Sequence, residues 1–96
     1  MISVIIPTYN RRKVILRAIN SILRQRFSEY EIIIIDDGSK DDTRSLIETI
    51  NDNRVKYFYI ENSGAANAKN YGVSKARYQY IMFLDSDDEI IDINLL

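Results

Sequence analysis

The stretch that decides the fold is IIIIDDGSKDDT, residues 32–43. Four consecutive isoleucines are typical of a strand that is buried on both faces of a parallel sheet. The run ends abruptly in two aspartates, a glycine and a serine. A second apolar segment, YIMFLDSDD at residues 80–88, also ends in carboxylates. One acidic strand end is ordinary, but two in a chain of 96 residues suggest a shared site.

On either side of this stretch, strand-like segments alternate with helical patterns. The predicted strands are ISVIIP (2–7), EIIII (31–35), VKYFYI (55–60, near a sheet edge) and YQYIMFL (78–84). Between them, apolar residues recur at helical spacing after Asn10 and around residues 46–50, and residues 64–71 are rich in helix formers. This alternation predicts an α/β fold, with a mainly parallel sheet of about four strands and helices on both faces. Ligands of such sheets bind beyond the carboxyl ends of the strands.

Local signals predict where the helices begin and end. Asn10 is expected to cap the first helix. Ser39 followed by Asp42 resembles a capping box for the second helix. Gly72 is expected to end the third helix in the left-handed conformation.

Composition restricts the chemistry. The chain has no cysteine and no histidine, which excludes thiolate chemistry, a Ser–His–Asp triad and His–metal sites. Its net charge of −1 gives no reason to expect nucleic-acid binding. No signal peptide or membrane-length apolar run is visible, so a cytoplasmic location is expected, with membrane association left open for the full-length protein.

A basic cluster lies in the first predicted helix. Its members are Arg11, Arg12, Lys13, Arg17 and Arg24, and most fall off the apolar stripe. The cluster could contact phosphate, but a solvated helix face is the favoured interpretation.

The sequence Asp85-Ser86-Asp87-Asp88 follows the fourth predicted strand. Two carboxylates about 4 Å apart repel each other by roughly 1 kcal/mol in water. A fold that gathers them must therefore hydrate them, protonate one or bind a cation. Oxygen ligands suit Mg²⁺ or Mn²⁺, whose coordination substrate phosphates can complete. A turn into a helix N-terminus explains the same residues equally well.

Other polar residues also stand at predicted strand ends. Asp36 and Asp37 precede Gly38, which is suited to a positive φ. An ionised carboxylate could accept a base N–H there, although a strand-to-helix turn is the somewhat favoured interpretation. Tyr9 could stack on a planar base, whereas packing is the commoner role of a lone aromatic. Lys69, in the third predicted helix, could contact phosphate.

Taken together, these segments resemble the N-terminal part of the family 2 inverting glycosyltransferases, which have the GT-A fold. The matching pieces are VIIPTYN (4–10), IIIIDDGSKDDT (32–43), NSGAANAKNYG (62–72) and FLDSDD (83–88). Each piece is modest, but their order and spacing make the match specific. The resemblance covers nearly the whole chain. It implies that residues 1–96 are a single donor-binding domain, the Rossmann-like nucleotide-binding half of a GT-A fold.

The resemblance implies a base pocket. Pro7 and Tyr9 would line the pocket, with Tyr9 stacking on the base. Asp37 would accept a hydrogen bond from the base N–H, and Asp36 would support the loop. Lys69 stands where the family commonly has arginine, and would contact base or phosphate.

The resemblance also implies a metal site. Asp85 and Asp87 match the family's Asp-x-Asp motif. Asp85 would face the ribose, and Asp87 would bind a Mn²⁺ or Mg²⁺ ion that bridges the diphosphate, with Asp88 behind it. Metal and phosphate contacts would stabilise the charge that builds on the departing nucleoside diphosphate.

The activity implied is transfer of a sugar from a nucleotide-diphosphate sugar, with a UDP-sugar expected, to a hydroxyl of a glycan or lipid-linked acceptor, with inversion. Family members are longer, and their catalytic base follows the Asp-x-Asp motif. We therefore expect the base after residue 96, and expect residues 1–96 to be a truncated N-terminal fragment that is inactive alone. Apolar surface normally covered by the remainder would favour self-association.

A noncatalytic Mg²⁺-binding regulatory module, resembling response-regulator receivers, is the alternative from another class. Receivers place an acid pair after their first strand and a phosphorylated Asp after their third. Here the acids follow the second and fourth predicted strands, which disfavours that interpretation. A structural domain without a ligand would require both acidic strand ends to be simple caps.

Overall fold

The computed structural model describes residues 2–24 and 29–84. Their elements are, in order, β1 (Ile2–Thr8), α1 (Arg12–Leu23), β2 (Tyr30–Asp37), α2 (Thr43–Glu48), β3 (Val55–Ile60), α3 (Ala65–Lys75) and β4 (Tyr80–Phe83). The strands form one sheet in the order β3-β2-β1-β4, and all three pairings are parallel. The predicted α/β alternation is confirmed, as is the place of residues 55–60 at an edge of the sheet.

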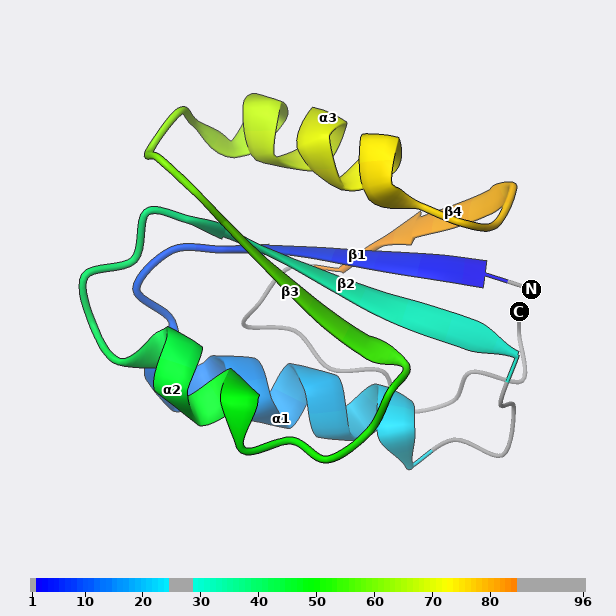
Figure 1. Cartoon of the computed structure of the whole chain (residues 1–96), viewed down its shortest axis with the longest axis horizontal. Coiled ribbons are helices and arrows are strands. Elements are labelled where there is room, and N and C mark those ends of the chain that lie inside the picture. Colours follow the sequence, from blue (N-terminus) through cyan, green and yellow to red (C-terminus); the bar gives the residue numbers. More distant parts are fainter. Residues whose placement is uncertain (1, 25–28, 85–96) are drawn as a thin grey trace.

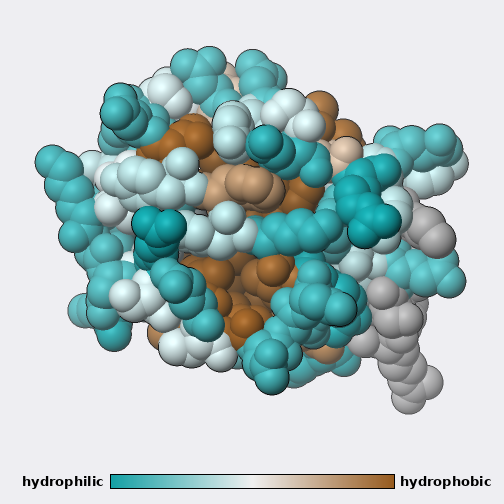
Figure 2. Space-filling model, viewed as in Figure 1, coloured by the Kyte–Doolittle hydropathy of each residue, from teal (hydrophilic) through white to brown (hydrophobic). Residues whose placement is uncertain are grey.

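Helices cover both faces of this sheet, as predicted. In Figure 1, α3 lies on one side of the strands, and α1 and α2 lie on the other. Residues of β1 alternate between the two layers. Val4 and Ile6 join the larger core cluster with α1 and α2, whereas Ile5 joins the smaller cluster with α3. Figure 2 shows hydrophobic surface above and below the middle of the molecule, where Figure 1 places these two layers. Burial from both sides explains the unbroken apolar run in β2.

The carboxyl ends of β1, β2 and β3 lie together at the left of Figure 1. The chain passes from β1 to β2 to β3, and then returns across the sheet to place β4 on the other side of β1. Strand order therefore reverses between β1 and β4, the point where ligands of open α/β sheets bind. The backbone N–H of Leu84 donates to the carbonyl oxygen of Ile5 at 3.0 Å, so contact with β1 continues one residue past the end of β4.

Helix α3 packs closely on the sheet through small residues, Ala68 and Gly72. The prediction that Gly72 ends this helix is wrong, because α3 continues to Lys75. Gly72 is buried, and a Cβ atom built on it would lie 2.5 Å from Cγ2 of Ile5 and 3.3 Å from Cγ1 of Ile35. The glycine is therefore required by close packing and not by chain termination.

Two predictions about helix caps are also wrong. Asn10 has a φ of 52° and precedes the N-cap residue of α1, which is Arg11. Asp42 is itself the N-cap residue of α2, so Ser39 is not part of a capping box for this helix. In both cases the polar side chain bonds another loop instead of its own helix, an interaction that a local signal does not reveal.

A buried polar network ties the strands together at their amino ends. The Glu31 carboxylate, only 2% exposed, accepts hydrogen bonds from Ser3 Oγ (2.7 Å), Lys56 Nζ (2.8 Å) and the Arg77 backbone N–H (2.6 Å). Ser3 Oγ in turn accepts from the backbone N–H of Tyr78 at 3.2 Å. Burial alone would raise the pKa of Glu31, but these hydrogen bonds outweigh it, and the pKa is lowered. The network fixes the turn between α3 and β4 against β1, β2 and β3.

Candidate functional site

The candidate site is the rim formed by the carboxyl ends of the strands. Thr8 of β1 is the register partner of Asp36 of β2, so Tyr9, the first residue after β1, and Asp37, the last residue of β2, both stand at the carboxyl edge of the sheet. Adjacent strands are about 4.8 Å apart. Tyr9 is 42% exposed, which leaves its ring available to a ligand. Pro7, also predicted here, is half-buried in β1. The structure therefore brings the predicted residues of β1 and β2 to one edge.

Asp36 is buried at this rim and is held by hydrogen bonds. It is 1% exposed, and its Oδ1 accepts a hydrogen bond from the Ser39 backbone N–H at 2.8 Å. Its Oδ2 accepts from the hydroxyl of Tyr57 on β3. Burial, reinforced by this hydrogen bond and by the Asp36 charge, raises the pKa of Tyr57 far above its usual range, so the phenol remains a donor. Asp36 thus holds the loop after β2, with both oxygens engaged by the protein.

Asp37 connects the end of β2 to the start of α3. Its Oδ1 accepts the Ser63 backbone N–H at 2.8 Å, and its Oδ2 accepts the Gly64 backbone N–H at 3.0 Å. Gly38 follows with a φ of +83°, and a Cβ there would lie 2.9 Å from the backbone nitrogen of Asn62. The predicted positive φ is confirmed, and the close approach to Asn62 gives a second reason for glycine. Together these contacts join the β2 and β3 loops into one wall of the rim.

Lys69 points from α3 toward the end of β4. Its Nζ lies 5.5 Å from the centre of the Phe83 ring, a cation–π contact. Phe83 is the last residue of β4 and stands two positions before Asp85 in the sequence. The predicted phosphate-binding lysine is therefore placed on the side of the rim where the acidic motif begins.

The acidic motif itself, including Asp85 and Asp87, lies outside the described residues. Within residues 2–24 and 29–84, no group of three or more acidic side chains could hold a metal ion. The described chain leads up to this motif, and its last residue, Leu84, donates its backbone N–H to the carbonyl oxygen of Ile5, three residues before the end of β1.

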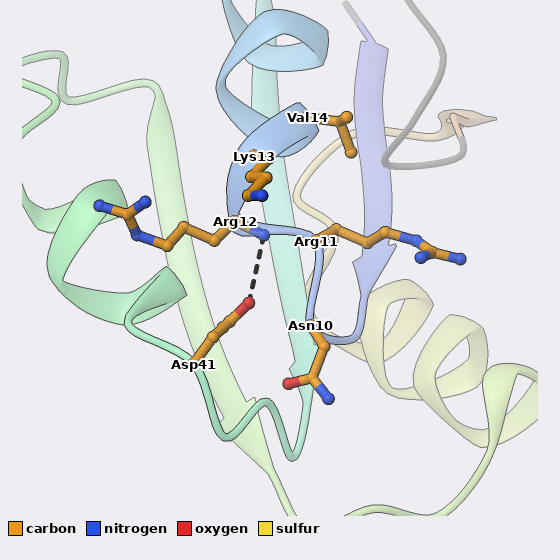
Figure 3. Close-up of a pocket in the computed structure, with 6 residues that line it drawn as sticks. All are labelled: Asn10, Arg11, Arg12, Lys13, Val14 and Asp41. Carbon is orange, nitrogen blue, oxygen red and sulfur yellow. Dashed lines mark hydrogen bonds between the residues drawn. The ribbon is translucent and has the colours of Figure 1, made fainter.

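A pocket lies at the start of α1, beside the rim (Figure 3). Its volume is about 500 Å³, and it is lined by Asn10, Arg11, Arg12, Lys13, Val14 and Asp41. The Arg12 backbone N–H donates to Asp41 Oδ2 at 3.3 Å, and the Arg12 side chain forms an ion pair with Asp42. Figure 3 shows the Arg11 and Arg12 side chains extending in opposite directions from the loop. The start of this helix is thus already capped by the loop that precedes α2.

Sequence reasoning missed the residues that join the loops of the rim. Ser39 Oγ accepts the Asn10 backbone N–H at 2.8 Å, and Asn10 Oδ1 accepts the Lys40 backbone N–H at 2.8 Å. Thr8 was also missed. Its hydroxyl oxygen is buried and makes no hydrogen bond within the described part of the chain. No local signal identifies the contacts of Asn10 and Ser39, because their partners are about 30 positions away in the sequence.

Parallel strands, helices on both faces and polar residues gathered beside the reversal of strand order define an α/β protein of the Rossmann-like class. Within this class, the chain belongs to glycosyl transferase family 2, whose family model matches residues 3–95. The resemblance seen in the sequence is thereby confirmed, and the family membership decides against the receiver-like module.

Curated relatives support this assignment. An uncharacterized glycosyltransferase of Rickettsia conorii is 51% identical over 91% of this chain and 15% of its own length. The GalNAc(5)-diNAcBac-PP-undecaprenol beta-1,3-glucosyltransferase of Campylobacter jejuni is 43% identical over 94% of this chain and 30% of its own length. The chain thus spans less than a third of either relative.

A solved structure shares the fold. The Staphylococcus aureus TarS 1–349 crystal structure in complex with UDP-GlcNAc is 35% identical, with a TM-score of 0.88 over 93% of this chain and 27% of that one. The fold is therefore that of the GT-A glycosyltransferases. Among the described residues, no helix has the length and apolar character needed to cross a membrane.

Proposed function

We propose that residues 1–96 form the donor-binding part of a glycosyltransferase that transfers a sugar from a nucleotide-diphosphate sugar to a hydroxyl acceptor. The observation that carries the proposal is the placement of Tyr9, directly after β1, and Asp37, at the end of the neighbouring β2, on one rim beside the reversal of strand order. Family membership supports the transfer reaction. The complex of the similar TarS with UDP-GlcNAc favours a UDP-sugar as the donor.

The base of the donor would lie against β1 and β2. The exposed ring of Tyr9 would stack on it, with Pro7 as part of the same wall. Asp37 would accept the base N–H. Its two backbone contacts leave capacity for this bond, because an ionised carboxylate has about four lone-pair sites. Those contacts also hold the carboxylate in place before the donor arrives, while the buried Asp36 supports the loop.

The diphosphate would lie toward the end of β4. Asp85 would bind the ribose side, and Asp87 would hold a Mn²⁺ or Mg²⁺ ion. When bound, this ion would neutralise charge on the departing nucleoside diphosphate. Oxygen-only ligands that directly follow β4 suit such a hard cation. Lys69, held over Phe83 at the same end of the strand, would add a positive charge near the phosphates.

The rest of the reaction would involve sequence beyond this chain. We propose inversion by a single displacement, with a catalytic base after residue 96 and a glycan or lipid-linked acceptor. The Campylobacter relative is named for an undecaprenol-linked acceptor, which supports a lipid-linked acceptor here. We also propose a cytoplasmic location, with membrane association of the full-length protein. Residues 1–96 alone should bind donor without transferring sugar.

Calorimetric titration with UDP, with and without Mn²⁺, tests the donor site. We expect binding that Mn²⁺ strengthens, and we expect Asp87→Ala to remove the metal effect while the base contacts remain. Asp52→Ala is the matched control, because Asp52 pairs with Arg54 away from the rim. A folded chain that does not bind UDP under either condition would contradict the proposal. An equal loss of the metal effect in the Asp52 variant would contradict the assignment of Asp87.

A further inference from the structure

We propose that the outer face of α1 is a docking surface for a membrane that contains anionic phospholipids. The surface is defined by Lys13, Arg17, Asn20 and Arg24, called here the α1 basic stripe. Their spacing of four, three and four residues places them on one face of a helix. All four are exposed. The inference assigns a surface and a partner to the proposed membrane association, and it does not depend on the donor site.

All charged side chains of this helix are basic. Residues 12–23, RKVILRAINSIL, include no acidic side chain, although the whole chain has a net charge of −1. The opposite face of α1 is fixed in the core through Ile15, Ala18, Ile19 and Ile22. The helix therefore cannot turn its apolar side outward, and any partner of the exposed side must be recognised by charge.

Two cations of the stripe, Lys13 and Arg17, are available to a partner. Within the described part of the chain, Lys13 and Arg17 form no ion pair. The acidic groups at the start of the helix are already engaged, because Asp42 pairs with Arg12 and Asp41 accepts hydrogen bonds from Arg12 and Thr43. The positive charges of Lys13 and Arg17 are thus not neutralised by neighbouring carboxylates.

The geometry favours a membrane over a nucleic acid. Eleven residue steps separate Lys13 from Arg24, about 17 Å of straight helix at a rise of 1.5 Å per residue. A row of this kind matches an extended, negatively charged plane. Single-stranded nucleic acid binds best where cations are interleaved with aromatic side chains on which bases stack, and the stripe has no aromatic residue. Adsorption through charge alone should also be weakened strongly by salt.

Cosedimentation of the full chain with vesicles tests the proposal. Vesicles of phosphatidylglycerol and phosphatidylcholine should bind the chain at low salt, and pure phosphatidylcholine vesicles should not. A lysine or arginine near an anionic surface strengthens binding about fivefold. The double variant Lys13→Gln/Arg17→Gln should therefore lower the partition coefficient by roughly 25-fold. Both positions are exposed, so circular dichroism should show an unchanged fold.

The matched control is Lys75→Gln/Arg77→Gln, which removes the same charge from exposed positions at the end of α3 and just beyond it, away from the α1 face. It should retain vesicle binding to within about twofold. Equal binding to neutral vesicles, an equal loss in the control, or tighter stripe-dependent binding of a single-stranded RNA would each overturn the proposal.

The UDP affinity of the stripe variant should be the same as that of the native chain. Membrane docking and donor binding can therefore fail separately.

Discussion

Asp37 of β2 accepts the backbone N–H of Ser63 at 2.8 Å, across a sequence separation of 26 residues. With the second contact to Gly64 at 3.0 Å, a single carboxylate holds the segment that leads into α3. The same side chain is the proposed acceptor for the base of the donor. Structure and binding are therefore coupled at this residue, and its substitution should affect both.

Asp37→Asn tests this coupling. An amide has only one acceptor oxygen, so one of the two backbone donors loses its partner. Ser63 and Gly64 are both exposed, so water can replace the lost partner, and the cost should be that of an ordinary hydrogen bond, about 0.5–1.5 kcal/mol. We expect a loss of that size in urea unfolding, together with UDP affinity weakened by on the order of tenfold or more. Asp52→Asn should lower stability through its contacts with Arg54 but leave UDP affinity unchanged. Equal UDP affinities in the two variants would exclude Asp37 from the donor site.

Gly72→Ala tests the contact between α3 and the sheet. Alanine is favoured over glycine within a helix by about 1 kcal/mol. Here the added methyl would meet the branched side chain of Ile5 at 2.5 Å, and overpacking of this kind costs about 1–3 kcal/mol. We expect a net destabilisation, measured by thermal or urea unfolding. Asn70→Ala, at an exposed position of the same helix, should be neutral or stabilising. A Gly72→Ala variant more stable than the native chain would show that the helix can shift away.

Stability should fall with acid through Glu31. Because its pKa is lowered in the folded state, its contribution is fully present above the unfolded pKa, about 4.3, and is lost as pH falls through the folded pKa. Glu31→Gln should destabilise the chain by about 1–3 kcal/mol at pH 7, since Lys56 loses its ionic partner. The difference between native and variant chains should shrink below pH 4.5 in urea titrations. A difference independent of pH would assign the effect to packing instead of ionisation.

The edge strand β4 should promote self-association. Tyr80, Ile81 and Phe83 are 65%, 37% and 46% exposed on a strand with one unpaired side among the described residues. Exposed apolar edges of this kind favour association. We expect light scattering to show concentration-dependent oligomers, which Ile81→Lys should reduce. Val73→Lys, at an apolar position of α3 with 42% exposure, is the control and should leave the oligomers intact. A monomer at all concentrations would contradict this expectation.

Strand alternation and the sheet direction followed from the sequence because apolar composition and strand-end acids are local properties, and the family followed from the resemblance of four motifs in order. Residues 32–37 carry their own signal for a buried strand that ends in acids. The structure places this strand, β2, between β3 and β1, as expected for a buried strand. Pro7, Tyr9, Asp36 and Asp37 could be assigned to one rim for the same reason, since all carboxyl ends of parallel strands share an edge.

Tertiary structure alone decided how the loops of the rim are tied together. Asn10, Ser39 and Gly72 each had a local signal for a helix terminus, and each is instead used in a long-range contact. The availability of Lys13 and Arg17 in the α1 basic stripe likewise depended on which neighbouring acids were already paired. Hydrogen bonds and packing between distant segments form only after the sheet brings them together, so short-range patterns predict the elements but not these partners.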